Sequence, residues 1–228
     1  MATFVLVHGA WHGSWCWQRV RGALRKIGHE VFTPTLTGIG ERSHLLAQNV
    51  DLNTHTLDVL NLIRWEELDD IVLCGHSYGG MVVTGVADRI PQRIRSLVFL
   101  DAFVPDQGQS LVDFAPIAED QRIDGWKCRP ISAEVFGVNP ADRSWVNRQC
   151  TEQSLACFTQ PVQLTGGLAR VNRIAYAFAS GWAGEKSLFR PFYEKAKARG
   201  WSTSEMDCGH DVMLDQPDAV TALLLNAI

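Results

Sequence analysis

The sequence predicts an α/β fold, in which a mostly parallel sheet of about six strands is flanked by helices. Short, continuous apolar runs such as Phe4–Val7 and Ile71–Cys74 are typical of strands that are buried on both faces. Between such runs, apolar residues recur at spacings of three and four, which indicates helices. Strands that alternate with helices favour parallel βαβ units. The length of 228 residues suits one large α/β domain, so we expect a single domain over residues 1–228.

The candidate elements follow one another in a regular order along the chain. The first strand stops at His8-Gly9, and Gly28 ends the first helix, as glycine commonly does. Pro34 and Gly38 end the second strand. Strands are expected at residues 4–7, 30–35, 71–74, 94–100, 173–178 and 202–206. Helices are expected at residues 17–27, around 57–63, and at 81–89, 189–199 and 218–228.

One region breaks this alternation. From about residue 105 to 167 the chain mixes tryptophans, prolines and short apolar patches, and it has no clear strand. We interpret this region as an insertion of short helices that covers one end of the sheet. Its tryptophans, Trp126 and Trp145, are candidates for an apolar substrate pocket together with Trp11 and Phe103, although aromatic residues in an insertion more often pack it.

Composition and charge exclude several classes of partner. The net charge is −4 and the pI is about 6.0, so we expect neither nucleic acid nor an anionic membrane as partner. No apolar run approaches the roughly 18 residues of a membrane-spanning helix, and the N-terminus lacks the pattern of a signal peptide. Six scattered cysteines without a CxxC pair fit reduced thiols, so a cytoplasmic protein is expected.

The segment Gly75-His76-Ser77-Tyr78-Gly79-Gly80 lies between a candidate strand and a candidate helix. A G-x-S-x-G motif in that context makes a sharp turn, and the glycines leave room for a strained serine at the carboxyl end of the sheet. Ser77 is therefore a candidate nucleophile. The alternative is a glycine-rich turn with an idle serine, because short motifs give false positives.

A serine hydroxyl needs a base to take its proton. His210 is the best placed of the seven histidines, because it follows the last candidate strand and precedes the last helix, as the order serine, acid, histidine requires. His8 ends the first strand and is interpreted as a structural or oxyanion-loop residue, and His76 is expected to point away from Ser77. The others are predicted to be surface or loop histidines: His12, His29, His44 and His55.

An oxyanion hole needs backbone N–H groups directed at the developing charge. The residue after the nucleophile, Tyr78, supplies one of them. The loop after the first strand supplies the other, and its natural donor is Ala10, because Gly9 and Gly13 let that backbone approach closely. No metal is required by this chemistry, and the sequence contains no cofactor motif.

With HGAWHGSWCW, GHSYGG and CGHDVMLDQP, the chain resembles the α/β-hydrolase superfamily. It is most similar to the branch that holds plant methyl esterases, hydroxynitrile lyases and bacterial carboxylesterases. The resemblance runs in order through most of the chain and implies the α/β-hydrolase fold. The insertion at about residues 105–167, expected to be a short helical cap, is shorter than in the plant members, and no residue role is carried over to it. The resemblance indicates the fold more strongly than the substrate.

The acid departs from the plant pattern. The plant relatives carry it after the strand that matches residues 173–178, where this chain has no carboxylate until Glu185. Asp101 ends the strand beside the one that carries Ser77, which resembles the arrangement of haloalkane dehalogenases and pancreatic-type lipases. We therefore assign the acid to Asp101, with Glu185 as the main alternative. Three further carboxylates stay open: Asp207, Asp211 and Asp215.

The sequence thus predicts a serine hydrolase that cleaves small carboxylic esters through an acyl-enzyme, with Ser77 as nucleophile, His210 as base and Asp101 as acid. Two alternatives remain. Hydroxynitrile lyases of the resembled branch carry a lysine after the catalytic histidine, where this chain has Asp211, whose charge opposes cyanide. A ligand receptor built on a hydrolase fold is the second alternative.

Overall fold

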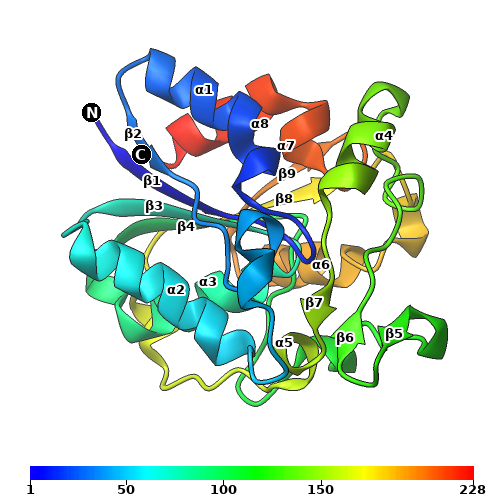
Figure 1. Ribbon diagram of the computed structural model, residues 1–228. Coiled ribbons are helices and arrows are strands. Elements are labelled where there is room, and N and C mark those ends of the chain that lie inside the picture. The colour runs from blue at the N-terminus through cyan, green and yellow to red at the C-terminus, as the bar shows by residue number, and fades with distance from the viewer.

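A six-stranded, fully parallel sheet forms the centre of the computed structural model, which describes residues 1–228 (Figure 1). Its strand order is β2-β1-β3-β4-β8-β9, and every neighbouring pair is parallel. The predicted α/β fold is confirmed. The strands are β1 (Thr3–Val7), β2 (Glu30–Phe32), β3 (Ile71–His76), β4 (Ile94–Leu100), β8 (Ile174–Ala179) and β9 (Ser202–Met206).

Helices cover both faces of the sheet, which explains the continuous apolar strands. Along β1, Phe4 and Leu6 belong to the core beneath α1 and α8, whereas Val5 and Val7 belong to the core beneath α2, α3 and α6 (Figure 1). The helices are α1 (Gln18–Lys26), α2 (Leu52–Trp65), α3 (Gly79–Arg89), α6 (Arg190–Ala198), α7 (Val212–Asp215) and α8 (Pro217–Asn226). Short 3₁₀ turns are η1 (Ser14–Trp17), η2 (Gly40–Leu45), η3 (Pro91–Arg93), η6 (Gly167–Arg170) and η7 (Gly184–Lys186).

Two element boundaries differ by three residues or more from the sequence-based expectation, and the others by no more than two. The second strand ends at Phe32 instead of residue 35, because Pro34 has no N–H to donate to the ladder. Helix α2 begins at Leu52, earlier than the periodic residues suggested. Asp51 caps its N-terminus by accepting a hydrogen bond of 2.8 Å from the Thr54 N–H.

The segment between β4 and β8 holds more than the short helices that were expected. It contains α4 (Pro140–Gln149), α5 (Ala156–Thr159) and the 3₁₀ turns η4 (Leu111–Asp113) and η5 (Glu119–Gln121). It also contains an antiparallel sheet of β5 (Arg122–Ile123), β6 (Lys127–Cys128) and β7 (Gln153–Ser154). Strands of two residues are too short to show an alternating pattern, so the expectation of a strand-free insertion was wrong.

The register of the sheet places two of the predicted site residues side by side. In the pairing of β3 with β4, His76 lies opposite Leu100. Ser77 and Asp101 follow directly after these two residues, at the carboxyl edge of the sheet. The Ser77 N–H donates to the Leu100 carbonyl at 3.3 Å, which holds the two strand ends together.

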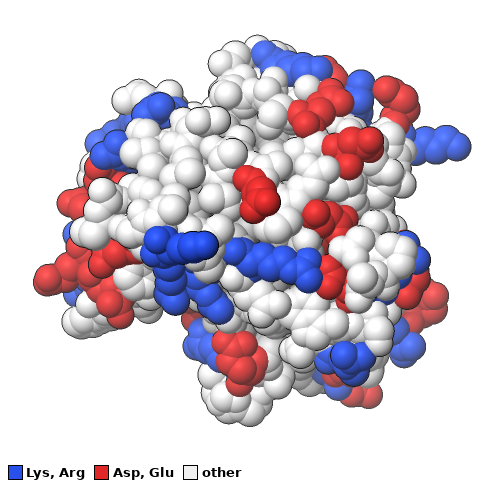
Figure 2. All heavy atoms as spheres, turned by 90° about the horizontal axis from the view of Figure 1, so that it is seen from above, with Lys and Arg blue, Asp and Glu red and all other residues white.

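The surface carries both signs of charge. On the face seen in Figure 2, Lys and Arg side chains are interspersed with Asp and Glu, as the small net charge suggests. None of the helices has the length and apolar character that a membrane crossing demands.

Candidate active site

Ser77 sits in a strained turn between β3 and α3. Its φ angle is 52°, in the left-handed region that a residue with a side chain seldom adopts. Gly79 makes the turn possible, because a Cβ at that position would lie 2.7 Å from the carbonyl oxygens of Val7 and His8. The turn thereby holds the side chain of Ser77 at the carboxyl edge of the sheet, and the residue is 9% exposed.

The loop after β1 runs directly against this turn. A Cβ on Gly9 would lie 3.0 Å from the Cβ of Ser77, so only glycine lets the loop come so close. The amide N–H groups of Ala10 and Tyr78 have no acceptor among the hydrogen bonds of the protein. Two free amides beside a serine hydroxyl are the arrangement that an oxyanion hole requires.

His210 and Asp101 form a short, buried hydrogen bond. The Nδ1 of His210 lies 2.7 Å from Oδ2 of Asp101, whose other oxygen accepts from the Ala179 N–H at 3.1 Å. Burial raises the pKa of Asp101, although its hydrogen bond to His210 opposes that change. With Nδ1 engaged in this way, Nε2 of His210 is the nitrogen left for the reaction.

Glu185 lies elsewhere. Its side chain is 84% exposed, and it pairs with Arg190 at 3.2 Å. It makes no hydrogen bond with His210, so the geometry favours Asp101 over this alternative.

Aromatic rings hold the imidazole of His210 in place. Phe189 stacks on it at 4.7 Å between ring centroids, and Phe136 packs at 5.0 Å. The backbone around it is fixed as well, because the His210 N–H donates to the Phe136 carbonyl at 2.9 Å. The Nε2 of His76 lies 2.9 Å from the His210 carbonyl oxygen, so His76 bonds to the backbone of the loop that carries His210 and does not face Ser77.

Ser77 and His210 line one apolar cavity of about 120 Å³. Ala10 and Tyr78 line it too, so the nucleophile, the base and both oxyanion donors predicted from the sequence meet in one place. Most of the remaining lining is apolar: Trp11, Phe103, Leu111, Ala115, Pro116, Ile117, Ile131, Phe136, Phe158, Trp182, Leu188 and Phe189, with Gln121 as a polar addition.

Two of the four aromatic residues proposed for the pocket do not line it. Trp11 and Phe103 do, but Trp145 packs edge-on against Trp15 at 5.0 Å, and Trp126 lies beside Lys127. Both are half-buried parts of the insertion itself. The sequence marked the insertion as aromatic but carried no signal for which of its rings face the serine.

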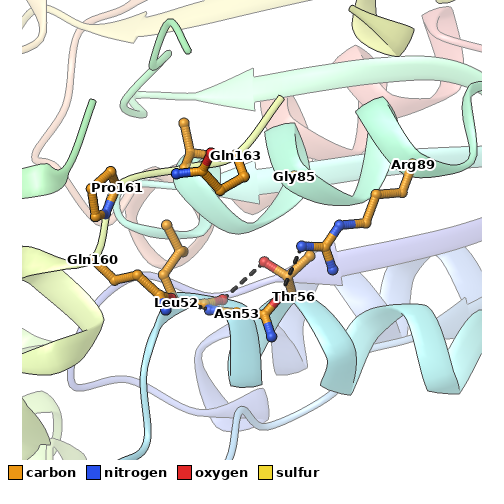
Figure 3. Close-up of a pocket in the computed structure, with 9 residues that line it drawn as sticks. Leu52, Asn53, Thr56, Gly85, Arg89, Gln160, Pro161 and Gln163 are labelled. Atoms are coloured by element: carbon orange, nitrogen blue, oxygen red, sulfur yellow. Dashed lines mark hydrogen bonds between the residues drawn. The ribbon is translucent and has the colours of Figure 1, made fainter. Parts of the chain in front are cut away.

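A larger groove of about 360 Å³ lies away from this cavity, between α2, α3 and residues 160–163 (Figure 3). It is mostly polar. Arg89 at its edge donates to Asn53 at 2.7 Å. None of Ser77, Asp101 and His210 lines it, so the smaller apolar cavity is the candidate active site.

Two histidines predicted for the surface or loops are buried. His55 accepts from the Tyr78 hydroxyl at Nδ1, 2.8 Å away, and donates from Nε2 to the Thr37 carbonyl at 2.9 Å. His12 is 2% exposed and lies 3.1 Å from Asp211. A lone histidine gives no sequence signal of burial, whether it lies in a loop, as His12 does, or in a helix, as His55 does, so these supports of the site were missed.

The comparisons with known proteins agree with this geometry. The model of the alpha/beta hydrolase family matches residues 4–223. The chain belongs to the alpha/beta hydrolase family. The resemblance inferred from the three sequence motifs is thereby confirmed. No group of three or more His, Cys, Asp and Glu side chains of this family member is arranged to hold a metal ion.

Individual relatives of this alpha/beta hydrolase include a carbendazim hydrolyzing esterase from Nocardioides sp. (strain SG-4G), which is 49% identical over 98% of each chain. Salicylic acid-binding protein 2 of Nicotiana tabacum is 38% identical over 45% of this chain and 40% of its own length. Among solved structures, an extracellular alpha/beta-hydrolase from a Paenibacillus species matches with a TM-score of 0.86 and 26% identity, over 100% of this chain and 99% of the other.

Proposed function

We propose that this protein is a serine esterase that hydrolyses small carboxylic esters through an acyl-enzyme, with Ser77 as nucleophile, His210 as base and Asp101 as acid. The observation that carries the proposal is the buried His210–Asp101 hydrogen bond of 2.7 Å at the wall of the cavity that Ser77 enters. The 49% identity to an esterase over nearly the whole chain supports the reaction class.

The reaction follows from the positions of these groups. The Oγ of Ser77 bonds to the ester carbonyl carbon and gives its proton to Nε2 of His210. Negative charge gathers on the carbonyl oxygen, which accepts hydrogen bonds from the N–H groups of Ala10 and Tyr78. The tetrahedral intermediate collapses, the alcohol leaves with the proton from His210, and water then releases the acid by the same route.

Asp101 orients and supports His210 in these steps. Its carboxylate accepts the Nδ1–H, which directs the lone pair of Nε2 toward the serine and stabilises the imidazolium when it forms. Residues 105–167 act as the cap in this proposal, because Leu111, Phe136 and Phe158 of that segment close the apolar cavity over Ser77.

The apolar lining favours esters with a small apolar acyl or alcohol part. The name of the Nocardioides relative makes carbendazim a useful member of the substrate panel. The lyase alternative has no supporting contact, because Asp211, which stands where the lyases carry a lysine, is a buried carboxylate paired with His12.

A p-nitrophenyl ester panel with the Ser77→Ala variant tests the proposal. We expect steady-state turnover by the wild-type protein and a loss on the order of 10⁶ in kcat for the variant, as for removal of other triad nucleophiles. Circular dichroism should show an unchanged fold. A variant that keeps more than about a tenth of the wild-type rate contradicts the assignment of Ser77, and a wild-type protein that binds esters without turnover favours the receptor alternative.

A further inference from the structure

A buried ion pair joins the oxyanion loop to the loop that carries His210. His12 lies two residues after Ala10, and Asp211 directly follows His210. The Nε2 of His12 is 3.1 Å from Oδ2 of Asp211, and the two residues are 2% and 0% exposed. The pair therefore connects the loop that carries the oxyanion donor Ala10 to the loop that carries the base His210.

The hydrogen-bond partners of His12 set its protonation state. Its Nδ1 lies 2.7 Å from the Ala10 carbonyl oxygen, which can only accept a hydrogen bond. Its Nε2 faces a carboxylate, which accepts as well. Both ring nitrogens must then carry protons, so His12 is an imidazolium.

The charges of the pair agree with this assignment. Burial alone would lower the pKa of His12, but Cys150 and the Asp211 carboxylate raise it well above its ordinary value. Burial alone would raise the pKa of Asp211, but the adjacent His12 lowers it below its ordinary range. Each group thus keeps the other charged.

The pair is packed on all sides. Trp15 stacks on the His12 ring at 4.9 Å between centroids, and Sγ of Cys150 lies 4.0 Å from Nδ1. His76 stands edge-on to His12 at 6.2 Å, and its Nε2 is 3.9 Å from Oδ1 of Asp211. The titratable groups around the pair are therefore His8, Cys16, His76, Cys150 and His210.

We propose that His12 is a positioning residue for ester hydrolysis, held as an imidazolium by Asp211, and that it fixes the Ala10 backbone relative to His210. This inference rests on the proposed function and deepens it. The bond from His12 holds the Ala10 carbonyl and, through the Ala10 Cα, limits the directions open to the Ala10 N–H in the preceding peptide group, whose Gly9 carbonyl bonds to His8 at 2.8 Å. Without the pair, the oxyanion donor and the base are no longer held to one another.

The expected signature is a change in kcat with little change in KM. The oxyanion exists only in the transition state, so a misdirected Ala10 N–H weakens the transition state and leaves ground-state binding nearly unchanged. If the pair had a merely structural role, its loss would alter stability and would not lower kcat while leaving KM unchanged.

Nuclear magnetic resonance tests the protonation state directly. The wild-type protein is labelled with ¹⁵N-histidine and measured at pH 8, where an ordinary histidine is neutral. We expect one histidine with protons on both ring nitrogens, and its signal should be missing from the His12→Phe/Asp211→Leu double variant. A His12 signal with one bare nitrogen at pH 8 overturns the proposal.

The same double variant provides the kinetic test. Phe and Leu have shapes close to His and Asp, and apolar replacement of a buried ion pair often preserves stability. We expect a thermal midpoint close to that of the wild-type protein, a kcat lower by roughly 10- to 100-fold and a KM within about threefold, since loss of a whole oxyanion donor costs more. His29→Phe, the same substitution far from the site, should keep the wild-type kcat.

A folded double variant with wild-type kcat overturns the proposal. If that variant does not fold, the Asp211→Asn variant replaces it in the kinetic test. The amide oxygen of the introduced asparagine accepts from Nε2 of His12 but, being uncharged, does not stabilise the imidazolium. An unchanged kcat in this variant overturns the proposal as well. A wild-type protein without ester turnover contradicts the proposed function instead. The resonance of His12 distinguishes this failure from failure of the His12 proposal, because it reports the protonation of His12 without any need for turnover.

Discussion

In the proposed mechanism, the hydrogen bond between His210 and Asp101 determines which imidazole nitrogen takes the proton of Ser77. At 2.7 Å the carboxylate holds Nδ1 as the donor and leaves Nε2 to accept. Asp101 has a φ of 42° and is fully buried, so the end of β4 holds it in a costly conformation with few alternatives. Strain of this kind at a buried carboxylate fits a functional role better than a loop cap.

Asp101→Asn should therefore keep the fold and lose activity. The amide would donate to Nδ1 and leave His210 in the wrong tautomer, which in a related triad lowers kcat by about 10⁴. Glu185→Gln is the matched control, since that side chain is 84% exposed and pairs only with Arg190. Steady-state kinetics on one ester checks both variants, and a larger loss in Glu185→Gln than in Asp101→Asn would reverse the assignment.

The turn between β3 and α3 is the element that fixes the position of Ser77. Gly79→Ala places a methyl group 2.7 Å from two backbone carbonyl oxygens, so we expect destabilisation by about 1–3 kcal/mol. Gly22→Ala in α1 is the control, because no atom lies within 4 Å of the added Cβ and alanine stabilises a helix by up to about 1 kcal/mol. Urea denaturation measures both, and a Gly79→Ala protein as stable as the wild type would show that the turn is not tightly packed.

The four inner strands of the sheet were predictable from the sequence because β1, β3, β4 and β8 each carry an apolar run. The ranges 94–100 and 202–206 agree with β4 and β9 to the residue. The position of Asp101 beside Ser77 followed from the same argument, since the ends of neighbouring parallel strands meet at one edge. Local patterns therefore predicted the geometry that places the candidate site.

The insertion and the buried histidines were not predictable in the same way. Strand β7 pairs with β6 across more than 20 residues of chain, and each contributes two residues, so no local period marks them. His12 and His55 owe their burial to contacts with Asp211 and Tyr78, which come from distant parts of the sequence. Such long-range polar contacts leave no periodic signal.

At the scale of the whole molecule, several histidines are buried in the neutral state. His8 shows the cause: its Nε2 accepts from the Leu36 N–H at 3.1 Å, and burial lowers its pKa to about 3. Burial also lowers the pKa of His55 and His76. In the unfolded chain all three take up protons near their ordinary pKa of 6.5, so the unfolded state binds more protons as the pH falls.

The protein should consequently lose stability when the pH falls from 7.5 to 5.5. His8, whose pKa falls to about 3, contributes up to about 1.4 kcal/mol per pH unit below 6.5, and the lowered pKa values of His55 and His76 act in the same direction. His12, with its raised pKa, opposes this loss between pH 7.5 and 6.5 and adds no slope below 6.5, where it is protonated in both states, and Asp101, with its raised pKa, also opposes the three. Urea denaturation at both pH values tests this, and His8→Gln should reduce the loss. Equal or greater stability at pH 5.5 would show that these histidines are not neutral in the fold.

The most direct test of the central claim, that Ser77 is the nucleophile activated by His210, is covalent labelling. A fluorophosphonate reacts with an activated serine, and peptide mass spectrometry locates the adduct. We expect one adduct, on the peptide that contains Ser77, with stoichiometric loss of esterase activity and no labelling of a His210→Ala variant that folds normally. An adduct on another residue would contradict the proposed role of Ser77. Full esterase activity after incubation with excess fluorophosphonate would contradict it as well.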